Sequence, residues 1–148
     1  MSVTRALYID GEWVETDESI ENINPSDTTE SLGRYAQATP ALADHAIASA
    51  NRAAKEWGQS PMETRYQMLM AIGTELIDRS AELGELLARE EGKTRAEGVG
   101  EVVRSGQFFH YFAAEVHRQI DDRVDSVRPG IEIETRREPI GVVAVISP

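Results

Sequence analysis

A chain of 148 residues with 41% hydrophobic residues is long enough for one domain with a core, and no apolar stretch approaches the roughly twenty residues that a bilayer span requires. The net charge of −11 argues against nucleic acid as a partner, because phosphate binding requires a basic surface. The absence of cysteine excludes disulfide bonds and thiolate metal sites built from this chain. The N-terminal residues lack the apolar core of a signal peptide, so we expect a cytoplasmic protein.

Two short strand pairs are predicted at the N-terminus, over residues 1–38. Apolar runs flank Asp10-Gly11, a pair typical of a type I′ hairpin turn because both central residues need positive φ. A second strand pair is predicted over residues 19–23 and 32–36, with turn-forming residues between the two runs. The opening of the chain is therefore expected to be a small antiparallel unit.

The first two of four helices predicted over residues 39–120 have clear start signals. Thr39-Pro40 provides an N-cap and a first-turn proline, and Gly58 ends the apolar periodicity. Ser60 and Glu63 have the spacing of a capping box for the second helix. Its buried stripe is predicted to consist of Leu69, Ile72, Leu76 and Ile77.

The third and fourth helices complete this predicted layer. Ser80 is expected to cap the third helix and Gly92 to terminate it. The fourth and longest helix is predicted over residues 95–119. Its inner side is predicted to consist of Val99, Val102, Val103, Gly106, Phe109, Phe112, Ala113 and Val116.

The C-terminal part alternates at first and then becomes continuously apolar. A polar loop is predicted over residues 121–129, and a half-exposed strand over residues 131–135. After Pro139, the run over residues 140–148 is typical of a strand buried on both faces. Such a strand needs parallel neighbours and covering helices, so we expect this chain to be the front part of a larger protein.

Four motifs in this order carry a family resemblance. They are Asn22-Ile23-Asn24-Pro25, Glu90-Glu91-Gly92-Lys93, Arg137-Glu138-Pro139-Ile140-Gly141-Val142-Val143, and Ile146-Ser147-Pro148. From Tyr8 onward, the chain resembles the N-terminal portion of the NAD(P)-dependent aldehyde dehydrogenases. Each motif alone is weak, but their order and separations make the resemblance specific.

The resemblance implies an α/β fold in which residues 1–148 form an incomplete N-terminal part of the cofactor-binding domain. Its expected parts are an antiparallel hairpin unit (1–38), a four-helix layer (39–120), a bridging strand for oligomerisation (130–138) and the first strand of a Rossmann-like parallel sheet (140–148). Members of this family oxidise aldehydes to carboxylic acids through a cysteine thiohemiacetal, hydride transfer to nicotinamide, and thioester hydrolysis.

No catalytic residue is assigned within this chain. The catalytic asparagine, cysteine and glutamate of the family follow later than the motifs found here, so the 148 residues alone are expected to be inactive. A rival hypothesis is a non-catalytic, acidic α/β binding or assembly module derived from a dehydrogenase front end. A small independent enzyme would need a nucleophile or base cluster, and none is visible.

Two binding sites are implied by the resemblance. Ile146, Ser147 and Pro148 match the strand end that touches the NAD or NADP cofactor, and open α/β sheets bind ligands beyond the carboxyl ends of strands. The alternative is an ordinary strand exit ended by proline. Asn22, Ile23 and Glu90 match a monovalent cation site built from backbone carbonyls and one carboxylate.

For the cation site, the alternative is a surface carboxylate near a helix end. Glu90 also stands where a shorter acidic side chain is common in the family.

The long helix carries a third implied site, because the corresponding family helix borders the substrate tunnel. Arg104 and Phe108 are the candidates there, and an arginine can bind a distal carboxylate of the substrate.

The alternative for Arg104 is a surface ion pair with Glu97 or Glu101 on neighbouring helical turns. The stretch over residues 104–109 weakly resembles dehydrogenases of 2-oxoglutarate semialdehyde.

The bridging strand implies a homodimer or homotetramer acting on a small aldehyde, because an alternating strand with a free edge can pair across subunits. Its alternative is an edge strand protected by its own charges.

Arginine supplies most of the positive charge. Only Lys55 and Lys93 are lysines among the 15 basic residues. An acidic, lysine-poor surface suits a cytoplasm with high salt, where screening limits self-repulsion. The composition therefore favours a halophilic source over compositional drift.

Overall fold

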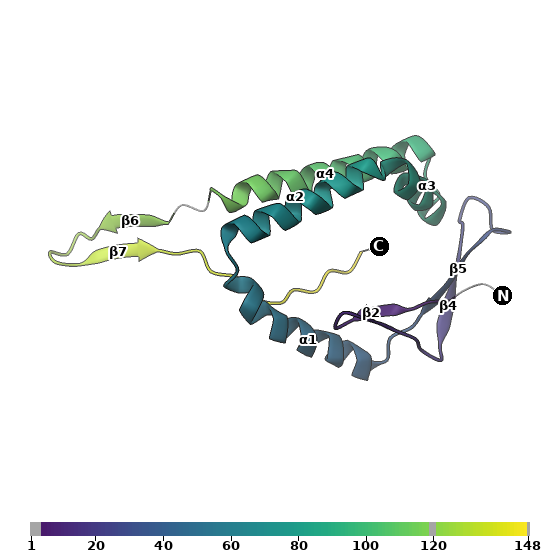
Figure 1. Cartoon of the computed structure of the whole chain (residues 1–148), viewed down its shortest axis with the longest axis horizontal. Helices are drawn as coiled ribbons and strands as arrows, with labels where there is room; N and C mark the ends of the chain where they lie inside the picture. Colours follow the sequence, from purple (N-terminus) through teal and green to yellow (C-terminus); the bar gives the residue numbers. More distant parts are fainter. Residues whose placement is uncertain (1–3, 119–120, 148) are drawn as a thin grey trace.

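The computed structural model describes residues 4–118 and 121–147. A small β unit lies at one end, and a two-stranded hairpin projects from the opposite end (Figure 1). Three packed helices form the body between them, and the first helix of the chain lies apart from these three, beside the β unit. The predicted α/β class, with the small sheets and four helices of an N-terminal segment, is confirmed. No helix among the described residues is both long and apolar enough to cross a membrane.

The first hairpin joins β2 (Leu7–Ile9) to the antiparallel strand β3 (Glu12–Val14). Asp10 has φ 55° and Gly11 has φ 84°, so both central residues occupy the left-handed region that a type I′ turn requires. The Ser49 hydroxyl and the Arg52 guanidinium donate to the two Asp10 carboxylate oxygens at 2.5 and 2.7 Å. These contacts fix the predicted hairpin against the first helix.

A three-stranded sheet follows, in the order β1-β5-β4. Strand β4 (Ser19–Ile23) is antiparallel to β5 (Ser31–Ala36), which confirms the second predicted pair. The parallel strand β1 (Thr4–Arg5) was not predicted. The pairing register shifts between Asn22 and Ile23, and Gly33 opposite this shift has φ 131°.

Helix α1 spans Pro40–Gly58, as predicted. The Thr39 hydroxyl accepts a hydrogen bond from the Leu42 amide at 3.3 Å, and proline at the first helical position loses no donor that the helix needs. Helix α2 spans Met62–Asp78. The capping box predicted for it is wrong, because the N-cap residue is Pro61 and makes no side-chain cap.

The two side chains of that predicted box are engaged elsewhere. The Ser60 hydroxyl donates to the Trp57 carbonyl at 2.6 Å, in the last turn of α1. The Glu63 carboxylate accepts from the Gln67 amide one turn later, at 2.7 Å. Ser60 therefore hydrogen-bonds to the end of α1 and does not cap α2.

Helix α3 spans Ser80–Glu91 and follows α2 after a single residue, Arg79. Ser80 was predicted to be its N-cap but lies inside the helix, because the Arg79 carbonyl already accepts the first intrahelical bond from Leu83. At the other end, Gly92 has φ 76° and terminates the helix as predicted.

Helix α4 spans Arg95–Val116. The Thr94 hydroxyl accepts from the Glu97 amide, and the Glu97 carboxylate accepts from the Thr94 amide, which forms a capping box. The helix ends before its predicted boundary, and Gln119 lies outside the described residues. It runs beside α2 and α3, which contain its main packing partners (Figure 1).

Glycines form the contacts between these helices. A Cβ atom at Gly73 would lie 2.7 Å from the Gly106 carbonyl, and one at Gly98 would lie 2.3 Å from the Gly84 carbonyl. Both crossings therefore bring backbone against backbone, which larger side chains would prevent. Val102 and Ala113 are buried along the same side of α4.

Two predicted core positions are wrong. Ile72 and Phe112 are 42% and 58% exposed. Ile72 is one residue from Gly73, so it points about 100° away from the contact, and Phe112 is about 120° around the helix from Gly106. The predicted inner position of Gly106 is confirmed, but the apolar pattern did not show that the helix contacts are centred on glycines.

The projecting hairpin consists of β6 (Asp122–Asp125) and β7 (Glu132–Thr135), paired antiparallel with Val124 opposite Ile133. The predicted strand over 131–135 is confirmed, but the predicted loop over 121–129 is partly wrong because it contains β6. A run of charged residues resembles a loop in sequence, although cross-strand pairing makes it a strand.

The apolar run also differs from its prediction as a buried strand. Residues 140–147 are in no strand, and Ile140 and Ile146 are 92% and 94% exposed. Among the described residues no strand lies beside this run to complete a hydrogen-bonded ladder. Pro148, the last residue of the predicted strand, lies outside the described residues.

Candidate functional site

The structure brings two of the three predicted cation ligands together. Asn22 lies in β4 and Glu90 in the last turn of α3, and the Asn22 side-chain amide donates to a Glu90 carboxylate oxygen at 2.7 Å. Ile23 follows Asn22 directly, at the register shift between β4 and β5. The predicted set therefore lies at the junction between the β unit and the end of α3.

A buried asparagine supports this junction. Asn24 is 7% exposed, and its amide donates to Glu30 at 2.7 Å while its side-chain oxygen accepts from the Ser26 amide at 2.9 Å. The Ser26 hydroxyl donates to the Gly92 carbonyl at 3.1 Å, just beyond α3. The turn is thus fixed both internally and against the helix end.

An ion pair joins the same two segments. Arg89 of α3 pairs with Glu30, and hydrogen bonds from Arg89 and Asn24 lower the pKa of the Glu30 carboxyl. Helix C-termini carry partial negative charge and attract cations. Carboxylate and carbonyl oxygens at such a place suit a hard cation. Within residues 4–118 and 121–147, no three His, Asp, Glu or Cys side chains gather as a metal cluster.

Two of the three predicted cofactor residues, Ile146 and Ser147, lie in the extended C-terminal segment. Ile146 is almost fully exposed, Ser147 is exposed, and Pro148 lies outside the described residues. The exposed backbone and the Ser147 hydroxyl are compatible with a ligand, but they offer only one edge of a binding site.

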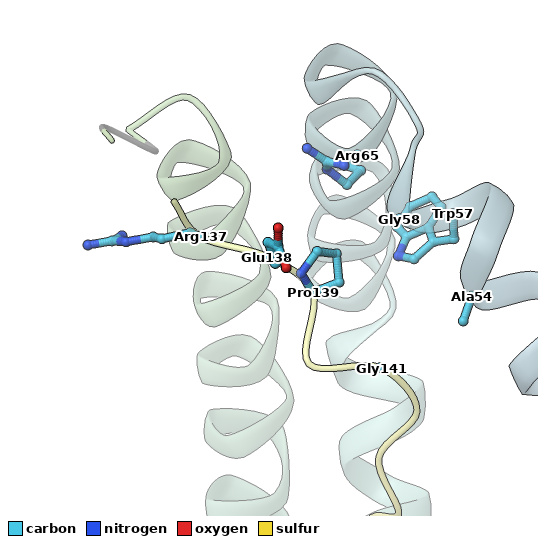
Figure 2. Close-up of a pocket in the computed structure, with 8 residues that line it drawn as sticks. All are labelled: Ala54, Trp57, Gly58, Arg65, Arg137, Glu138, Pro139 and Gly141. Atoms are coloured by element: carbon cyan, nitrogen blue, oxygen red, sulfur yellow. The ribbon is translucent and has the colours of Figure 1, made fainter. Parts of the chain in front are cut away.

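A pocket of about 350 Å³ lies at the start of this segment. Figure 2 shows it between Trp57 at the end of α1, Arg65 of α2, and the crossing chain at Glu138-Pro139, whereas Arg137 points away. Pro139 reaches within 3.5 Å of the position that a Cβ atom would take at Gly58. The pocket was not predicted, since its walls are brought together only by tertiary packing.

Arg104 and Phe108 share one exposed side of α4. They are four residues apart, so they lie on neighbouring turns of one face, and Phe108 is 56% exposed. Tyr111, which was not singled out from the sequence, adds a ring packed edge-to-face on Phe112 with centroids 5.2 Å apart. An arginine beside aromatic rings can bind a ligand that has an apolar body and an anionic end.

The two acidic side chains considered as partners for Arg104 are bound to other groups. Glu97 caps the helix through Thr94, and Glu101 accepts hydrogen bonds from the Lys93 ammonium at 2.7 Å. These bonds raise the pKa of Lys93. The alternative prediction, a surface ion pair of Arg104 with Glu97 or Glu101, therefore does not describe this helix.

Comparisons with known proteins agree on one family. The sequence model described as "Aldehyde dehydrogenase family" matches residues 13–148. The chain is 38% identical over 143 residues to the alpha-ketoglutarate semialdehyde dehydrogenase of the halophile Haloferax volcanii, a match that covers 95% of this chain and 30% of that protein.

Solved structures show the same backbone arrangement. Betaine aldehyde dehydrogenase from Staphylococcus aureus, in complex with NAD+, superposes with a TM-score of 0.84 at 30% identity, over 91% of this chain and 28% of that one. An NADP-dependent enzyme from Escherichia coli gives a TM-score of 0.80 at 26% identity, over 85% and 26% of the two chains. The chain thus spans less than a third of the length of the relatives it matches.

Proposed function

This chain belongs to the aldehyde dehydrogenase family, and from that premise we propose that the protein containing it oxidises an aldehyde to a carboxylic acid in the cytoplasm. NAD or NADP is the proposed hydride acceptor. The observation that supports this most strongly is the match of backbone and sequence to betaine aldehyde dehydrogenase over 91% of the chain.

We assign part of the cofactor contact, and no catalytic group, to these residues. Ile146, Ser147 and Pro148 are proposed to touch the cofactor, with the Ser147 hydroxyl available as a donor. The acidic or basic residue that distinguishes NAD from NADP at the ribose is not among them. The chain has no cysteine, so the family's nucleophile is not supplied here, and the 148 residues alone are expected to be inactive.

The substrate that α4 suits best is an aldehyde with a distal carboxylate. The Arg104 guanidinium can form charge-assisted, bidentate hydrogen bonds with such a group, while Phe108 contacts the apolar part of the substrate. A 2-oxo acid semialdehyde has this chemistry, and the Haloferax relative is described as acting on alpha-ketoglutarate semialdehyde. This assignment also agrees with the weak sequence resemblance over residues 104–109.

We also propose a monovalent cation at Asn22, Ile23 and Glu90. The 2.7 Å hydrogen bond between Asn22 and Glu90 places these two residues side by side, and a bound ion would draw on backbone carbonyls and the Glu90 carboxylate. An increase in thermal stability in KCl or NaCl, compared with a bulky organic cation at equal ionic strength, would support the site. Equal stability in all three salts would contradict it.

The projecting hairpin suits subunit pairing. All residues of β6 and β7 are exposed, and their free edges can pair with another strand. We therefore propose a homodimer or homotetramer that uses this hairpin. A non-catalytic acidic assembly module would also use such an edge, and the exposed hairpin is the observation in favour of that second candidate.

Turnover by the complete enzyme tests the main proposal. A panel of semialdehydes and simple aldehydes would be offered with NAD and NADP, and the reduced nicotinamide measured by its absorbance. We expect oxidation of at least one carboxylate-bearing semialdehyde. Failure on every aldehyde, while calorimetry shows bound cofactor, would reject it. Tight NAD binding by the 148 residues alone would contradict the assignment of one cofactor edge.

A further inference from the structure

The exposed face of α4 that carries Arg104 and Phe108 lies opposite the point where α4 touches α2. At that point Gly106 meets Gly73, and a Cβ atom on Gly106 would lie 2.6 Å from the Gly73 carbonyl oxygen. It would also lie 2.6 Å from Cγ1 of Ile77. Only a hydrogen atom fits between the two helices at this position.

The geometry of the helix connects this contact to the exposed face. Arg104 and Phe108 are each two residues from Gly106, which places them about 160° around the helix from it. A group that pushes α4 away from α2 at Gly106 therefore moves both side chains outward along nearly the same line. The distance between helices depends on the side chains at their contact, so glycine gives the shortest one.

We propose that Gly106, against Gly73, is a positioning residue that sets how far Arg104 reaches toward the substrate carboxylate. This inference rests on the proposed function, because it concerns the same substrate-binding face. Glycine is disfavoured inside helices, and the contact gives its presence at 106 a specific reason. Gly100 of the same helix has no atom within 4 Å of its Cβ position, so not every glycine of α4 has this role.

The test compares two substrates in the complete enzyme carrying Gly106→Ala. One substrate is a semialdehyde with a distal carboxylate, and the other is an aldehyde of the same length that lacks it. We expect KM for the carboxylate-bearing substrate to rise about 10-fold, because bidentate hydrogen bonds are sensitive to small displacements. We expect KM for the other substrate and kcat for both to change by less than about 2-fold.

Two matched glycine variants separate positioning from loss of stability. Gly100→Ala adds a methyl group on the same helix in open space and should leave both KM values unchanged. Gly98→Ala creates a backbone clash at 2.3 Å with α3, about 9 Å along the axis from Arg104. It should lower the unfolding temperature without separating the two substrates.

A double-mutant cycle identifies Arg104 as the group that is moved. In the Arg104→Ala background, Gly106→Ala should no longer raise KM for the carboxylate-bearing substrate. If Gly106→Ala does not fold, Ile77→Phe presses on the same point through a flexible side chain and should raise that KM in the same direction.

Equal changes for the two substrates would overturn the inference, and so would a KM increase that persists without Arg104. A wild-type enzyme that oxidises no aldehyde would reject the proposed function instead. The two failures are therefore distinguishable, because either refutation of the positioning role is observed in an active enzyme.

Discussion

The helical layer and the C-terminal region over residues 121–147 differ in where their contacts come from. Helices α2, α3 and α4 meet backbone to backbone through the pairs Gly73–Gly106 and Gly84–Gly98. The hairpin β6–β7 pairs with itself, and the run that follows is extended and exposed. The face of α4 is thus positioned from within the chain, whereas residues 121–147 have few such contacts.

We expect the largest loss of stability from a substitution at a point where two helices meet at glycine. Gly98→Ala places a methyl group 2.3 Å from the Gly84 carbonyl oxygen, and a backbone atom cannot turn aside. We expect a loss of about 3 kcal/mol in the free energy of unfolding, measured with urea. Gly100→Ala, the matched control, should be neutral or stabilising by about 0.5 kcal/mol. Equal midpoints for the two variants would mean that the crossing is not close-packed.

The buried asparagine at the β junction comes next. Asn24→Ala removes one hydrogen-bond donor to Glu30, which keeps its ion pair with Arg89, and the acceptor of the Ser26 amide. It should cost about 2 kcal/mol, because polar groups in a nearly buried turn lose their hydrogen bonds. Asn51→Ala on the exposed face of α1 should change unfolding by less than about 0.5 kcal/mol. A similar cost at both sites would show that the turn is not fixed as described.

The capping box of α4 has a smaller expected effect. Thr94→Ala should destabilise the chain by about 1 kcal/mol, since the Glu97 amide loses its acceptor. Thr64→Ala, in the exposed first turn of α2, serves as the control and should have little effect. Circular dichroism during thermal unfolding measures both. An unchanged melting temperature for Thr94→Ala would contradict the cap.

The ion pair at the junction predicts a pH dependence. Hydrogen bonds from Arg89 and Asn24 lower the pKa of Glu30 from its ordinary value of 4.5. A carboxyl with a lowered folded-state pKa contributes stability that is complete above 4.5 and is lost as the pH falls through the folded-state value. Below pH 4.5, the melting temperature should therefore fall more steeply with decreasing pH for the wild type than for Glu30→Gln. Parallel curves would exclude this contribution.

The smallest effect is expected in the projecting hairpin. Ile133→Thr should change the unfolding of the helical body by less than about 0.5 kcal/mol, because Ile133 is 45% exposed and its strand pairs with β6 of the same hairpin. Val102→Ala, at a buried position on α4, should cost about 2 kcal/mol. If Ile133→Thr proved as costly as Val102→Ala, the hairpin would be coupled to the helices.

Local signals predicted most of the elements. Asp10-Gly11 and Gly92 occupy left-handed positions as expected, and Thr39 caps α1, because in each case the physical requirement involves only nearby residues. Ser60 and Ser80 fail as predicted caps because each serine lies close to a preceding helix end, and sequence alone does not decide which helix it serves.

Tertiary contacts account for the remaining differences. Phe112 and Gly106 were both predicted on the inner side of α4. Gly106 is buried there as predicted, but the contact is centred on it, which leaves Phe112 exposed. For the predicted cation site, the sequence motifs grouped Asn22 with Glu90, and the structure brings these two side chains into contact. The pocket at Trp57 was missed, because Pro139 reaches it only after the chain has passed through the hairpin.

Hydrogen exchange on the 148-residue chain tests most directly whether the helical layer is more stable against local unfolding than the C-terminal region. Amides of α4 between residues 98 and 113 should exchange slowly, close to the rate set by global unfolding. Amides over residues 140–147 should exchange at nearly the rate of an unprotected peptide. Comparable protection in the two segments would contradict the account, because the apolar run would then be held as firmly as the helices that meet at glycine.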